Sequence, residues 1–154
     1  MLEQLKTAWG DYVQPLLQRP KRLQVAALCL RQEADRQQVL LITSRDTGRW
    51  ILPKGWPIEG KTSPEAAMQE AWEEAGVRRG RLCPEPVGTY HYDKTISTGW
   101  AMPVETLVFS VEVEELADDF PEVDERRRGW FSPQEASERV DEPELKAILR
   151  EFGT

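Results

Sequence analysis

The 154-residue sequence predicts an α/β protein built as an α/β/α sandwich around a mixed β-sheet. Short runs rich in β-branched and aromatic residues alternate with segments in which apolar residues recur at helical spacing. Predicted helices also flank the strands in chain order, so that they can cover both faces of a sheet. The length and the 40% hydrophobic content suit one domain over residues 1–154, with a helical extension over residues 1–20.

The first elements are a helix and three short strands. The predicted N-terminal helix has an apolar side and ends before Pro20. Two β-prone runs follow at residues 24–30 and 38–43, and the polar stretch between them predicts a strand pair joined by a loop. Residues 50–52 form another short β-prone run, which Pro53 ends.

Residues 53–63, PKGWPIEGKTS, contain two prolines and two glycines, so we expect a loop without regular structure that leads into a helix. Two helix starts fit the sequence. Thr62 with Glu65 matches a capping box, whereas Ser63 followed by a proline matches an N-cap with proline at the first helical position. Gly76 predicts a left-handed C-terminal end.

The second half of the chain predicts three strands and then two helices. The strands lie at residues 87–92, 105–113 and near 129–131. The helices cover residues 133–140 and 142–152, and the inner face of the second consists of Leu145, Ile148 and Leu149.

Composition excludes several classes of function. The net charge of −7 argues against a general nucleic-acid or membrane-surface binder, because both usually need a basic face. The two cysteines form no CxxC pair, which disfavours a zinc site or a disulfide scaffold. The N-terminus has no signal pattern and no apolar run approaches the ~20 residues of a membrane span, so we expect a cytoplasmic protein.

Residues 69–76, QEAWEEAG, gather three glutamates on one helix. Glu70, Glu73 and Glu74 lie at i, i+3 and i+4, where each like-charged pair costs about 0.2–0.5 kcal/mol. A solvated charged face is one interpretation. A metal site is the other, because the carbonyl of nearby Gly55 could point at the same place and a set of oxygen ligands suits Mg²⁺ or Mn²⁺.

The stretch from Gly55 to Val77, GWPIEGKTSPEAAMQEAWEEAGV, resembles the Nudix box, G-x5-E-x7-R-E-U-x-E-E-x-G-U, where U is a bulky aliphatic residue. The box glycines and all three helix glutamates match without a gap. Two positions differ, since Lys61 replaces a glutamate and Gln69 replaces an arginine. The predicted order of strands also resembles the Nudix fold over most of the chain.

This resemblance implies a hydrolase that requires Mg²⁺ or Mn²⁺ and cleaves a diphosphate linkage. It implies Glu74 or Glu70 as the catalytic base, and it places the metals on the three glutamates and on the carbonyl of Gly55. Many members of the family add a glutamate from outside the box, for which Glu125 is our candidate, with Glu122 behind it. Bound cations would lower the pKa of a bound water and neutralise charge that develops on the diphosphate.

The replacement of the box arginine leaves a second function open. In the family this arginine orients a catalytic glutamate, and Gln69 can donate a hydrogen bond but carries no charge. The protein could therefore be a ligand-binding or regulatory member with weak or lost hydrolysis. Removal of pyrophosphate from RNA ends is a third possibility, and the acidic net charge counts against it.

The segment VLLITSRDTGRWILPKGWPIEG resembles diphosphoinositol polyphosphate phosphohydrolases, and its Pro-Lys-Gly element resembles diadenosine polyphosphate hydrolases. Arg45, Arg49 and Lys54 precede the predicted metal site and are our candidates for binding substrate phosphates; surface charge on a turn is the alternative. Trp56 and Tyr92 could stack on a base, although core packing is the commoner role of such residues. We expect a small phosphorylated partner, no nucleic acid or membrane, and a monomer or homodimer.

Overall fold

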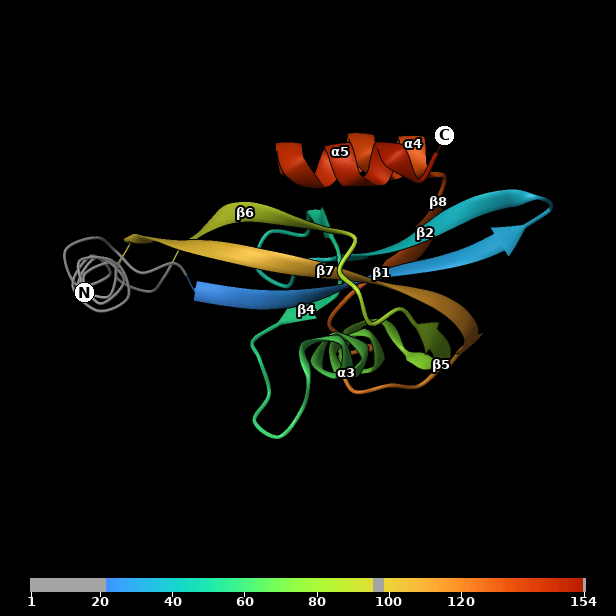
Figure 1. The fold of residues 1–154 in the computed structure, drawn as a ribbon, viewed down its shortest axis with the longest axis horizontal. Helices are drawn as coiled ribbons and strands as arrows, with labels where there is room; N and C mark the ends of the chain where they lie inside the picture. Colours follow the sequence, from blue (N-terminus) through green and yellow to red (C-terminus); the bar gives the residue numbers. More distant parts are fainter. Residues whose placement is uncertain (1–21, 96–98, 154) are drawn as a thin grey trace, which may run out of the picture.

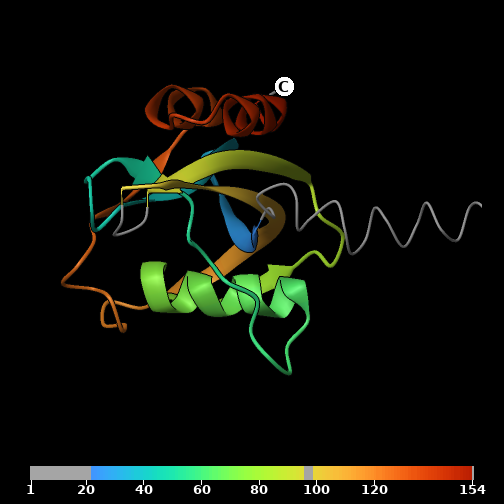
Figure 2. The same ribbon diagram turned by 90° about the vertical axis from the view of Figure 1, so that its left-hand side faces the viewer.

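The computed structural model describes residues 22–95 and 99–153. These residues form three layers, in which helix α3 (Ser63–Ala75) covers one face of a mixed sheet (Figure 1). Helices α4 (Pro133–Arg139) and α5 (Pro143–Glu151) cover the other face (Figure 2). The predicted α/β/α sandwich is confirmed. The N-terminal helical extension over 1–20 lies outside the described residues, and the single domain over 1–154 stays a prediction.

The sheet of the described residues has eight strands. In chain order they are β1 (Arg22–Glu33), β2 (Arg36–Thr43), β3 (Trp50–Ile51), β4 (Lys54–Gly55), β5 (Val77–Leu82), β6 (Gly88–Thr95), β7 (Ala101–Leu116) and β8 (Arg128–Phe131). The central order is β3-β2-β1-β7-β5, with β4 beside β1, β6 beside β7 and β8 beside β2. Strands β1 and β7 run parallel, whereas β1 and β2 are antiparallel, so the sheet is mixed as predicted.

The loop expected between the first two strands is much shorter in the structure. Strands β1 and β2 continue as a ribbon until Glu33 pairs with Arg36, so that only Ala34 and Asp35 form the turn. Both have positive φ angles, 50° and 65°. Such a two-residue turn matches the right-handed twist of the flanking strands, and polar residues on an exposed ribbon give no apolar signal from which it could be predicted.

The expectation that residues 53–63 lack regular structure is wrong at their start. Lys54 and Gly55 form strand β4, which pairs with Ala26 and Val25 of β1. This pairing uses backbone hydrogen bonds to a strand distant in sequence, and two residues are too few to show a period. Strand β5 was not predicted either, because its arginines and glycine dilute the apolar pattern (VRRGRL).

Each face of the sheet carries its own hydrophobic core. On the α3 side the helix contributes only small buried residues, Ala66, Ala67, Ala71 and Ala75. On the other side, Leu145, Ile148 and Leu149 of α5 are buried, as predicted. Small side chains let α3 lie close to the sheet, which brings its glutamates near β4.

Local signals define the ends of α3. The Thr62 side chain accepts from the backbone N–H of Glu65, and the Glu65 side chain accepts from that of Thr62. The capping box is therefore confirmed as the helix start, in preference to the Ser63 alternative. Gly76 ends the helix at φ 75°, which confirms the left-handed end.

Candidate functional site

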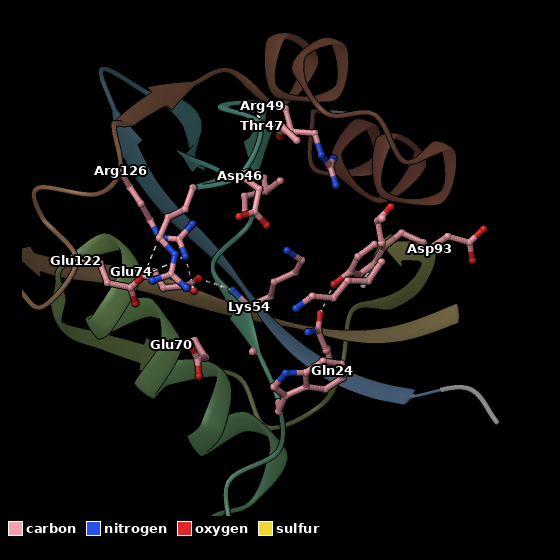
Figure 3. A pocket seen from close by; sticks show the side chains of 18 residues that line it. Gln24, Asp46, Thr47, Arg49, Lys54, Glu70, Glu74, Asp93, Glu122 and Arg126 are labelled. Carbon is pink, nitrogen blue, oxygen red and sulfur yellow. Dashed lines mark hydrogen bonds and ion pairs between the residues drawn. The ribbon is translucent and has the colours of Figure 1, made fainter. Parts of the chain in front are cut away.

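A pocket of about 640 Å³ opens where β4, the C-terminal half of α3, the end of β6 and the segment after β2 meet (Figure 3). Its described lining contains as many acidic as basic side chains. The basic ones are Arg45, Arg49, Lys54, Lys94 and Arg126, and the acidic ones are Asp46, Glu70, Glu74, Asp93 and Glu122. The pocket therefore brings together Gly55, two of the three helix glutamates and all three predicted phosphate-binding residues.

Glu70 packs directly against Gly55. A Cβ atom at Gly55 would lie 2.3 Å from the carboxyl carbon of Glu70, so any larger residue there would displace this side chain. Burial, followed by the charges of Glu74, Glu73 and Glu122, raises the pKa of Glu70 to about 7, although Arg126 opposes the rise. Within residues 22–95 and 99–153, no group donates a hydrogen bond to this carboxylate. Glu70 is thus a half-buried carboxylate poised to take up a proton or a cation.

Glu74 has both of its oxygens engaged. Oε1 accepts from the backbone N–H of Lys54 at 2.9 Å, and Oε2 accepts from the Arg126 guanidinium at 2.9 Å. Burial raises the pKa of Glu74, while these two donors oppose the rise. The two hydrogen bonds hold the carboxylate in one orientation.

The side chain of Arg126 is buried, although arginine side chains are usually exposed. Only 6% of the side chain is exposed. Its guanidinium donates to Glu74, to Glu122 and to the backbone carbonyl of Thr43, at 2.9–3.1 Å. Arg126 therefore joins α3, the end of β2 and the segment before β8 (Figure 3). Nothing in the ERRR stretch distinguishes this arginine from its neighbours, because only the fold brings the two carboxylates to it.

Glu73 and Gln69 lie outside this lining. The Gln69 amide donates to the Glu73 carboxylate at 2.8 Å along the helix, so Gln69 orients a box glutamate without a charge. Outside the box, Glu125 has a side chain that is 49% exposed and lies 3.6 Å from Arg45. Glu122 instead lines the pocket, where its side chain is 17% exposed. The metal-binding roles of Glu73 and Glu125 stay predictions.

Two of the three predicted phosphate-binding residues have acidic partners. Arg45 lies 3.4 Å from Glu122, and Arg49 donates to the buried Glu142 at 2.5 Å. Lys54 has no such ion pair among the described residues, and its ammonium lies 5.2 Å from the centre of the Tyr92 ring. Burial lowers the pKa of Lys54 to about 8. An anion bound beside Lys54 would stabilise the protonated, positively charged form of its amine, which burial disfavours.

The donors at this site are suited to a hard divalent cation. Glu70, Glu74, Glu122 and the carbonyl of Gly55 offer only oxygen atoms, and the pKa of Glu70 is raised by burial and by the neighbouring glutamates. Within the described ranges, no group of three or more Asp, Glu, His or Cys side chains is already arranged to coordinate a metal ion. The Arg126 guanidinium bridges Glu74 and Glu122 instead.

Comparison with known sequences identifies the family to which the chain is similar. The NUDIX domain model matches residues 20–152. Nudix hydrolase 13, mitochondrial, of Arabidopsis thaliana is 34% identical over 120 residues, which cover 75% of this chain and 59% of the relative. Diphosphoinositol polyphosphate phosphohydrolase 3-alpha of Mus musculus is 34% identical over 116 residues, 72% of this chain and 64% of the relative. The chain thus spans about three-fifths of the length of these relatives.

The described residues contain no helix that is long and apolar enough to cross a membrane. The names of the relatives include mitochondrial and chloroplastic proteins, and the predicted cytoplasmic location of this chain stays a prediction.

Solved structures share the fold. The C. elegans Ap4A hydrolase in a binary complex has a TM-score of 0.61 at 20% identity, covering 85% of this chain and 94% of that chain. The NUDIX domain of Shewanella oneidensis NrtR, complexed with ADP ribose, has a TM-score of 0.64 at 17% identity, covering 96% of this chain and 98% of that chain. Because the family model spans most of the sequence and both relatives match over more than two thirds of it, the chain belongs to the Nudix family.

Proposed function

We propose that the protein is a metal-dependent hydrolase that cleaves a phosphoanhydride bond in a nucleoside-diphosphate-linked or highly phosphorylated small molecule. Diadenosine polyphosphates and diphosphoinositol polyphosphates are the two candidate substrate classes. The observation that carries the proposal is the Glu70 carboxylate, which packs against Gly55 inside a charged pocket with a pKa raised to about 7. A carboxylate with a pKa near 7 can act as a general base near neutral pH.

Glu70, Glu74 and Glu122, with the carbonyl of Gly55, would hold Mg²⁺ or Mn²⁺. Glu73 and Glu125, also predicted as ligands, would join only after their side chains turn toward the pocket. When bound, the metal supplies Lewis-acid stabilisation of the diphosphate oxygens and lowers the pKa of water.

The protein side chains have separate roles in this proposal. Glu70 accepts the proton of the attacking water, because Glu74 is already held by Lys54 and Arg126. The water oxygen bonds to phosphorus as the bridging P–O bond breaks, which leaves two phosphate products. Lys54, which lies between these acids and Gln24 (Figure 3), would contact the phosphate groups.

The charge of the pocket favours a nucleotide over a diphosphoinositol. Acidic and basic side chains balance in the described lining, and Arg45, Arg49 and Arg126 already form ion pairs within the protein. A ring that carries phosphates at many positions would meet Asp46 and Asp93 as well as the glutamates. Nucleoside-diphosphate-linked molecules concentrate their charge in one short segment.

The alternatives are a binding or regulatory protein without hydrolysis and an RNA 5′-pyrophosphohydrolase. The replacement of the box arginine motivates the first, but Gln69 keeps its contact with Glu73 and does not line the pocket. The arrangement of Glu70, Glu74 and Arg126 therefore does not depend on it. The net charge of −7 continues to count against guidance of an RNA strand.

The test is a panel of diadenosine polyphosphates, diphosphoinositol polyphosphates, nucleotide sugars and dinucleotides, incubated with the protein in Mg²⁺ or Mn²⁺ and assayed for phosphate products. We expect turnover of at least one class, and a loss of roughly 100-fold or more in Glu70→Gln and in Glu74→Gln. Glu65→Gln is the matched control, since it makes the same change on the same helix and keeps a capping-box residue. A panel that is inert with both metals would support the binding protein instead.

A further inference from the structure

We propose that the part of the pocket lined by Gln24 and Trp56 is a nucleobase subsite, in which Trp56 stacks on the base and Gln24 donates a hydrogen bond to its edge. The subsite would take a purine nucleotide. This inference rests on the proposed function, because it names the part of the substrate that lies beyond the diphosphate.

The backbone brings these two residues near each other where the pairing of β1 with β4 ends. In the antiparallel ladder, Val25 pairs with Gly55 and Ala26 pairs with Lys54, so Gln24 and Trp56 occupy the next position, one step beyond the last pair. Residues at opposite positions of an antiparallel pair face the same side, with Cβ atoms about 4.5–5.5 Å apart. Both residues line the pocket. Gly55, which packs against the Glu70 carboxylate, therefore directly precedes Trp56 in the chain.

Gln24 is a buried polar side chain with an unused donor. Only 3% of the residue is exposed, and its Oε1 atom accepts from the Tyr92 hydroxyl at 2.5 Å. The Gln24 side chain lines the cavity (Figure 3). None of the described residues accepts a hydrogen bond from its amide nitrogen. A ligand acceptor such as a ring nitrogen or carbonyl of a base would satisfy it.

Trp56 offers the flat surface. The residue is 39% exposed, although a large apolar side chain is usually buried. The Lys94 ammonium lies 5.2 Å from the centre of the indole ring, so the ring already binds a cation at the pocket wall. Lys54 lies in the middle of the pocket, with Arg126, Glu74 and Glu122 on one side and Gln24 on the other (Figure 3). A nucleotide placed with its phosphates at Lys54 thus reaches Trp56 with its base.

The choice of a purine follows from area and from charge. A bicyclic base covers more of the indole than a pyrimidine, and base–aromatic stacking changes affinity by about 10-fold or more. Gln24 and Trp56 are uncharged, and the opposite charges of the neighbouring Lys94 and Asp93 offset each other, so this part of the pocket suits a neutral ring better than a phosphate group.

The experiment measures binding of AMP, CMP and ribose 5-phosphate by calorimetry without added metal, since none of the three contains a phosphoanhydride bond. We expect AMP to bind more tightly than CMP, and ribose 5-phosphate to bind about 10-fold or more weaker than AMP. Trp56→Ala and the near-isosteric Gln24→Met should remove most of the AMP preference and leave the affinity for ribose 5-phosphate unchanged. Trp56→Phe should restore most of it. Trp100→Ala is the control, because Trp100 is another exposed tryptophan that is not part of the described pocket lining.

The results separate the two proposals. Equal affinity for AMP and ribose 5-phosphate, or an equal loss of both in Trp56→Ala, would overturn the nucleobase subsite even if the panel above is hydrolysed. An AMP preference that depends on Trp56 would support the subsite even if no substrate in that panel turns over, and only the hydrolase proposal would then fail.

Discussion

At the scale of single residues, Arg126 is the cation that holds the carboxylates of Glu74 and Glu122 in place. It contacts Glu74 and Glu122. The Glu74 carboxylate also accepts from the backbone N–H of Lys54, and the backbone N–H of Glu122 donates to the carbonyl of Glu73. A buried arginine between two carboxylates satisfies charges that would otherwise be costly, and removal of one partner leaves the others unpaired.

We therefore predict that Arg126→Met lowers the free energy of unfolding by about 2–4 kcal/mol, measured by urea denaturation in metal-free buffer. The matched control is Arg81→Met, which removes an exposed arginine paired with Glu112 and should change the stability far less, because exposed ion pairs are screened by solvent. Equal losses in the two variants would contradict a special role for Arg126. Added Mg²⁺ should reduce the loss in Arg126→Met, because a cation at the same carboxylates replaces the missing charge.

The raised pKa of Glu70 predicts a pH dependence of stability. Its pKa rises from 4.5 in an unfolded chain to about 7 in the fold, so between these values the folded protein binds more protons than the unfolded chain. The stabilisation from this group is complete below pH 4.5 and is lost as the pH rises through about 7. Because the side chain is half-buried, we expect the loss to be about 1–2 kcal/mol.

The measurement is the Tm of metal-free protein from pH 5 to pH 8, compared with Glu70→Gln. The variant should show a smaller fall over this window, and Glu65→Gln, an exposed change on the same helix, should fall like the parent. Mg²⁺ at pH 8 should raise the Tm of the parent protein more than that of Glu70→Gln. The same fall in the parent and in Glu70→Gln would exclude Glu70 as its source.

At the scale of elements, helix α3 is held in register by its ends. Gly76 at φ 75° turns the chain into β5, and a Cβ atom there would lie 2.5 Å from the Phe120 ring and 2.6 Å from the Arg128 guanidinium. Glycine is therefore required here for two reasons: the backbone is left-handed, and neighbouring side chains leave no room for a Cβ atom.

Gly76→Ala should therefore destabilise the fold by about 2–4 kcal/mol, from backbone strain of about 1 kcal/mol and from steric displacement of Phe120. Gly60→Ala separates the two causes, since Gly60 has φ 83° with no atom within 4 Å of the added Cβ. It should lose about 1 kcal/mol or less in the same denaturation experiment. If both variants lost the same amount, the contact with Phe120 would contribute nothing.

At the scale of the whole molecule, the pocket is connected to the helical layer on the other face of the sheet. Arg49 donates to Glu142, which precedes α5 and is 7% exposed, and the second carboxylate oxygen of Glu142 has no partner among the described residues. This pair ties the segment between β2 and β3 to the α4–α5 layer.

Arg49→Met should lower the unfolding free energy by about 2–3 kcal/mol, because it leaves a buried carboxylate without its cation. The double variant Arg49→Met/Glu142→Met should lose less than Arg49→Met alone, since it removes the buried charge as well. Denaturation of the two single variants and the double variant completes the cycle. Additive losses would show that the two residues are energetically independent.

Local sequence was sufficient for part of the fold. The ends of α3, at Thr62 and Gly76, and the apolar face of α5 were predictable, because capping and helical periodicity depend on residues within a few positions of one another. Strands β4 and β5 were not, since their pairing partners lie far along the chain.

The sequence by itself determined the family and the helix that carries Glu70, Glu73 and Glu74, because fixed spacing on one helix is a local property. Only the tertiary structure decided which of these acids face the pocket, that Glu122 rather than Glu125 lines it, and that Arg126 is buried among them. Burial and ion pairing join segments that are distant in sequence. The partners of Glu74 come from β4 and from the segment before β8, and no pattern within the helix could have specified them.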